Sequence, residues 1–75
     1  MTRTIRNVPV FKVTPDKTFE IDMWNGDPIP DAMLHAVENA GFQPVAGAGY
    51  SFLYKGEDWQ EGELKLAEMG FLRLG

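Results

Sequence analysis

The chain has 75 residues, a net charge of −4 and no cysteine, which predicts one domain without disulfide bonds. With a single histidine, a Cys/His zinc site is excluded, and no apolar run reaches the length of a membrane span. The first residues also lack the apolar core of a signal peptide, so we expect a cytoplasmic protein.

The N-terminal part of the sequence predicts a β-hairpin. Residues 4–13 are rich in β-branched and apolar side chains, as strands are. Pro9 cannot donate a ladder hydrogen bond, which favours an edge position or a bulge for this strand. Residues 14–17 suit a type I turn with Pro15 in its second position. Residues 19–24 then alternate apolar and acidic side chains, the pattern of a half-buried strand.

Residues 29–40 predict an amphipathic helix with Asp27 as the candidate N-cap. Its apolar positions recur at helical spacing and form the expected buried stripe: Met33, Ala36, Val37 and Ala40. Gly41 suits the left-handed residue that ends a helix, and Phe42 is its expected hydrophobic partner.

The C-terminal part predicts strands at 42–45, 50–55 and 71–74 and a helix at 58–69. Asp58 and Glu61 have the spacing of a capping box at the start of this helix. Gly62 costs about 1 kcal/mol relative to alanine inside a helix, so a start near Glu63 is the alternative. Gly70 ends the helix.

This order predicts one α+β domain over residues 1–75, with an antiparallel sheet and both helices on one of its faces. From residue 19 onward the order is βαββαβ, as in a ferredoxin-like fold, preceded by an extra N-terminal strand. The alternative is a ββα unit repeated twice.

Motifs that carry chemistry are missing from the sequence. It contains no P-loop, no GxGxxG, no HExxH and no GxSxG. The glycines of residues 47–49 suit a hairpin loop, and His35 suits a solvated position on the helix surface between Asp31 and Glu38. We therefore expect no enzyme activity, no cofactor and no metal.

Apolar residues beside carboxylates predict a protein-binding surface. Leu34 and Leu64 fall outside the buried stripes of their helices, and tryptophan, which occurs at two element ends, is enriched at binding hot spots. The predicted surface consists of Trp24, Leu34, Glu38, Asp58, Trp59, Glu61, Leu64 and Glu68. The alternative is that the two leucines meet across the helix pair and both indoles cap the core.

Charge is unevenly distributed along the chain. Residues 1–17 sum to +3, and residues 18–75, with three basic and ten acidic side chains, sum to −7. The N-terminal cations predict, as an alternative site, a nucleic-acid grip formed by Arg3, Arg6, Lys12 and Lys17. The acidic remainder makes nucleic acid an unfavoured partner, and cations on an edge strand also prevent unwanted strand pairing.

The sequence thus predicts a non-enzymatic protein that docks on a basic surface of a larger partner and inhibits or adapts it. Its helix carboxylates would pair with arginines or lysines, and Trp59 and Leu64 would anchor the contact. This small, acidic, cysteine-free profile is similar to that of accessory proteins of phages and mobile elements, which include anti-CRISPR inhibitors; the likeness lies in the profile alone. A self-associating module is the alternative, because residues 50–54 are apolar on both faces of their strand.

Overall fold

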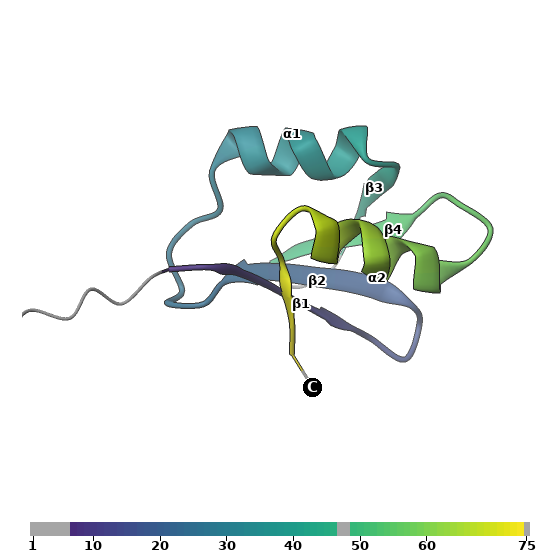
Figure 1. Ribbon diagram of the computed structural model, residues 1–75, viewed down its shortest axis with the longest axis horizontal. Coiled ribbons are helices and arrows are strands. Elements are labelled where there is room, and N and C mark those ends of the chain that lie inside the picture. Colours follow the sequence, from purple (N-terminus) through teal and green to yellow (C-terminus); the bar gives the residue numbers. More distant parts are fainter. Residues whose placement is uncertain (1–6, 47–48, 75) are drawn as a thin grey trace, which may run out of the picture.

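The computed structural model describes residues 7–46 and 49–74, which form a five-stranded mixed sheet and two helices. The strands are β1 (Pro9–Val13), β2 (Thr18–Met23), β3 (Phe42–Val45), β4 (Tyr50–Tyr54) and β5 (Leu72–Arg73). The helices are α1 (Asp31–Asn39) and α2 (Trp59–Glu68), and both lie over the same face of the sheet (Figure 1). The predicted element order is confirmed, although residues 4–6 of the predicted first strand lie outside the described residues.

The strand order is β3-β4-β2-β1-β5. The pairs β1–β2, β2–β4 and β3–β4 are antiparallel, as predicted, but β5 runs parallel to β1. In this parallel pair Val10 lies beside Leu72, and the N–H of Leu74 donates to the carbonyl of Phe11 at 2.8 Å. The sheet is therefore mixed, and a ferredoxin-like order is not confirmed because β1 separates β2 from β5.

The prediction of an edge position or a bulge for β1 is wrong. β1 lies between β2 and β5, and its pairing with β2 is continuous from Pro9–Met23 to Val13–Phe19. Pro9 is tolerated because it is the first residue of the strand and lies beyond the residues that β5 pairs with. The proline that does lie on an edge strand is Pro44, in β3.

The core lies between the helices and the inner face of the sheet. β1, β2 and β4 place large apolar side chains on this face, the helices contribute Val37 and Leu66, and the segments after the helices contribute Phe42 and Phe71. Both helices end on a glycine with left-handed φ, +106° at Gly41 and +98° at Gly70, as predicted. This conformation turns the chain back so that each following phenylalanine enters the core.

Helix α1 differs from its prediction in its start and its buried side. It begins at Asp31 rather than residue 29, because Ile29 precedes Pro30 and a residue before proline is disfavoured in helical conformation. Asp27 does not cap the helix; its Oδ2 accepts a hydrogen bond from Asn7 Nδ2 at 3.3 Å. Ala36, predicted to be buried, is exposed, and Leu34 packs against the core instead.

Helix α2 begins at Trp59, and the alternative start near Glu63 is wrong. Asp58 is its N-cap, with Oδ1 accepting from the N–H of Gln60 at 3.0 Å. Gly62 is buried inside the helix. A Cβ at this position would lie 3.0 Å from ring atoms of both Phe19 and Tyr54, so glycine allows the helix to approach the sheet.

Candidate protein-binding surfaces

The outward side of α2 carries an exposed leucine with carboxylates on both sides. Leu64 is 65% exposed. The residues one helical turn before and after it are exposed as well, and they are Gln60, Glu61, Ala67 and Glu68. We call these five residues the α2 surface. It combines one large apolar side chain with a carboxylate on each side.

One carboxylate of the α2 surface is tied to the sheet. Glu61 Oε1 accepts a hydrogen bond from the Tyr54 hydroxyl at 2.8 Å. This bond, with a smaller contribution from burial, raises the pKa of Tyr54 above its usual value, because the protonated phenol is the form that donates. On the side of α2 nearer the sheet, Glu63 Oε2 lies 2.9 Å from Arg73 Nη1. The first half of α2 is thereby joined to β4 through Glu61 and to β5 through Glu63.

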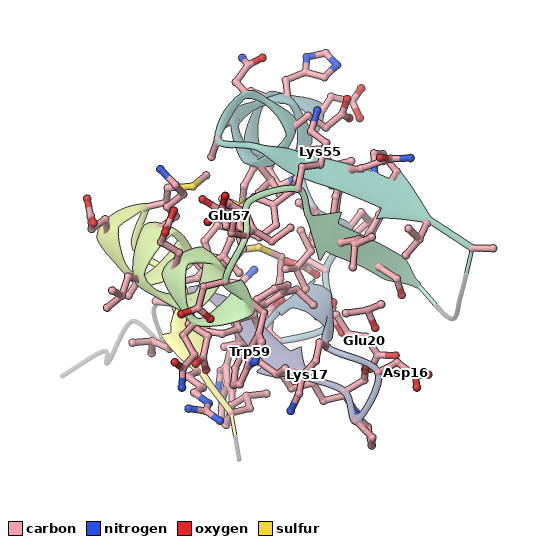
Figure 2. The ribbon with its side chains drawn as sticks, turned by 90° about the vertical axis from the view of Figure 1, so that its right-hand side faces the viewer. Asp16, Lys17, Glu20, Lys55, Glu57 and Trp59 are labelled. Atoms are coloured by element: carbon pink, nitrogen blue, oxygen red, sulfur yellow. The ribbon has the colours of Figure 1, made fainter. Side chains whose placement is uncertain are left out.

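Trp59 does not belong to the α2 surface. Its indole is half-buried and packs against the core. The ammonium of Lys17, in the β1–β2 turn, lies 4.5 Å from the ring centroid, and Figure 2 shows these two side chains together. Lys17 itself adopts a left-handed φ of +66°. This arrangement agrees with the alternative interpretation, in which the indole caps the core.

The other predicted binding residues are divided among separate places. Leu34 is half-buried against the core, while Glu38 is exposed on α1. Asp58 serves as the N-cap of α2. Trp24 directly follows β2 and is 60% exposed. The structure therefore brings together Glu61, Leu64 and Glu68, and separates them from the tryptophans.

A second candidate surface lies on the sheet face that points away from the helices. Strand pairing places Val10 opposite Asp22, on the face opposite to the core residues Phe11 and Ile21. A hollow of about 490 Å³ opens here, and we call it the open-face hollow. Its lining includes Val10, Lys12, Glu20, Asp22, Trp24, Tyr50 and Leu74.

The open-face hollow was not predicted from the sequence, although two of its residues were named in other predicted sites: Trp24 in the protein-binding surface and Lys12 in the alternative nucleic-acid site. Its residues come from β1, β2, the start of β4 and the segment after β5. Alternation along β2 does indicate that Glu20 and Asp22 face away from the core. Only the strand order, however, shows that Val10 and Leu74 share that face.

Of the four cations of the alternative nucleic-acid site, the two that the structure describes contact different partners. Arg3 and Arg6 lie outside the described residues. Lys12 Nζ pairs with Glu20 Oε1 at 3.4 Å, and Lys17 lies over Trp59. The described ranges hold five of the seven basic side chains and all eleven carboxylates.

Among the described residues, no three His, Asp or Glu side chains lie close enough together to hold a metal ion. Within these same ranges, neither helix is long and apolar enough to cross a bilayer. His35 is exposed on α1.

Comparisons with protein-family models, with curated proteins and with solved structures find no match to this chain.

Proposed function

We propose that this chain is a non-catalytic binding protein that docks on a basic surface of a larger partner protein through the α2 surface, and inhibits or adapts that partner. The observation that carries the proposal is Leu64, which is 65% exposed between Glu61 and Glu68. A leucine in the middle of an outward helix face gains nothing from solvent exposure. Because 65% of its surface is exposed, Leu64 gains about 1–2 kcal/mol when a partner buries it.

The surrounding charge indicates the chemistry of the partner. The described carboxylates outnumber the described basic side chains by eleven to five, and two of those five, Lys12 and Arg73, already pair with carboxylates. Such an acidic surface attracts cationic partners and speeds their association. Docking on lysines and arginines that hold nucleic acid would displace the nucleic acid by competition. A role as a phage or mobile-element accessory inhibitor acting in the cytoplasm belongs to the same proposal.

The test is affinity capture from cells of the protein's source, with the wild type and with Leu64→Ala. Leu53→Ala is the matched control, because Leu53 is also exposed but lies on β4 rather than on α2. We expect Leu64→Ala to lose a partner that wild type and Leu53→Ala both retain, with unchanged thermal unfolding. Retention of every partner by Leu64→Ala would contradict the proposal.

A second variant separates charge from apolar contact. Glu61→Gln combined with Glu68→Gln keeps the shape of the α2 surface and removes its two charges. We expect this variant to slow association and to reduce the salt dependence of binding. If light scattering shows that the retained partner is a second copy of the chain, the self-associating alternative replaces the proposal.

A further inference from the structure

We infer that the open-face hollow binds an arginine side chain presented by the partner. This inference rests on the proposed function, since it identifies one group of the same basic partner. The open-face hollow lies on the other side of the sheet from α2, so the two contacts are separate.

The hollow has apolar side chains suited to the aliphatic stem of a long side chain. Leu74 is 38% exposed and Trp24 is 60% exposed, and both line the hollow. Val10, on the same face, is only 3% exposed and lies beneath its neighbours. Arginine is long enough to lay its methylene groups on such a surface while its charged head reaches a polar group.

The charges in the hollow leave one carboxylate for that head. Lys12 and Glu20 pair with each other at 3.4 Å, so they sum to zero. Asp22 is exposed and, among the described residues, makes no ion pair. Its Oδ1 accepts from the N–H of Met23 at 2.8 Å, which holds the carboxylate against the strand. The net charge of the hollow is therefore −1, the complement of one cation.

An aromatic face lies beside this carboxylate. The N–H of Trp24 donates to the carbonyl of Val8 at 2.8 Å, so the backbone pairing continues past the end of β2. Side chains two residues apart on a strand share a face and lie about 7 Å apart, which places the Trp24 indole next to Asp22. A guanidinium can stack on an indole and pair with a carboxylate through its planar edge at the same time. A lysine ammonium lacks this planar geometry, so arginine is the preferred ligand.

The test is an NMR titration of the full chain with the peptide acetyl-Ala-Leu-Arg-Leu-Ala-amide. The citrulline analogue is the matched control, because it keeps the shape of arginine and lacks the charge. We expect the arginine peptide to shift the Trp24 indole N–H and the backbone amide of Asp22, and the citrulline peptide to bind at least about fivefold more weakly. Equal binding of both peptides, or no shift at Trp24 with either, would overturn the inference.

Variants locate the contact. Asp22→Asn and Trp24→Leu should each weaken the arginine peptide about fivefold or more, and Asp16→Asn, which changes a carboxylate in the β1–β2 turn, should leave it unchanged. Leu64→Ala should also leave peptide binding unchanged, so failure of the hollow and failure of the α2 surface give different results. Equal affinity of wild type and Asp22→Asn would overturn the role of the carboxylate.

Discussion

Gly62 lies on the side of α2 that packs against the sheet, and Gly62→Ala tests whether there is room for a methyl group at this position. In an exposed helix the same change stabilises by about 1 kcal/mol through helix propensity. Here the new Cβ would lie 3.0 Å from Phe19 Cζ and from Tyr54 Cγ. The two effects therefore oppose each other, and their magnitudes decide the sign.

The neighbouring ring has little room to move away. Phe19 is 0% exposed, and its ring centroid lies 6.1 Å from that of Phe11 and 5.4 Å from that of Phe42. Adding a carbon to a well-packed core costs about 1–3 kcal/mol, and we expect the upper part of this range. After the gain in propensity is subtracted, Gly62→Ala should lower the free energy of unfolding by about 1–2 kcal/mol. For a domain of this size, the melting temperature should fall by about 4–16 °C.

The assay is thermal unfolding followed by circular dichroism, with Gln60→Ala as the control. Gln60 lies in the same helix and is exposed, so its replacement should change stability by no more than about 0.5 kcal/mol. A rise in melting temperature for Gly62→Ala would refute the reasoning, because it would show that propensity outweighs the close approach.

Two further predictions concern a helix end and a tyrosine. Gly70→Ala should reduce the free energy of unfolding, measured by urea denaturation, by about 1–2 kcal/mol, because a φ of +98° is unfavourable for alanine. A Cβ at this position would touch nothing within 4 Å, so the cost comes from the backbone alone. Gly70→Asn should cost less, and equal stability of Gly70→Ala and wild type would contradict the backbone argument. In a Tyr50→Phe background, where Tyr54 is the single tyrosine, Glu61→Gln should lower the midpoint of the tyrosine absorbance titration, because the hydrogen bond to Glu61 raises the pKa of Tyr54. Since the folded pKa lies above the unfolded value of about 10, this contact gives its full stabilisation below about pH 10 and loses it as pH rises through the folded pKa. An unchanged midpoint would rule out that origin of the shift.

Local signals in the sequence were enough to predict the elements but not their arrangement. Alternation identified β2, and the glycines at 41 and 70 identified both helix ends, because each signal depends on a few neighbouring residues. The buried side of α1 was predicted wrongly at two positions, because the expected stripe included Ala36 and left out Leu34. The structure packs Leu34, the larger apolar side chain, partly buried against the core, because it gains more from leaving water.

How well each candidate surface could be predicted depends on how close together its residues lie in the sequence. The α2 surface is contained in a single helix, so helical spacing alone placed Leu64 among carboxylates. The environment of Trp59 depends on Lys17, a turn residue far away in the sequence. The open-face hollow needs several strands in a particular order, and a β5 strand of two residues gives almost no pattern to read.

The parallel pairing of β1 with β5 also affects how the protein is made. Val10 and Phe11 meet their partners at residues 72 and 73, so this part of the sheet closes only after those residues have been synthesised. Contacts between such distant segments slow folding. Until residues 72–74 leave the ribosome, β1 pairs with β2 along one edge and presents its other edge, unpaired, to any other chain nearby. Translation is therefore the stage at which we expect this protein to be most prone to aggregate.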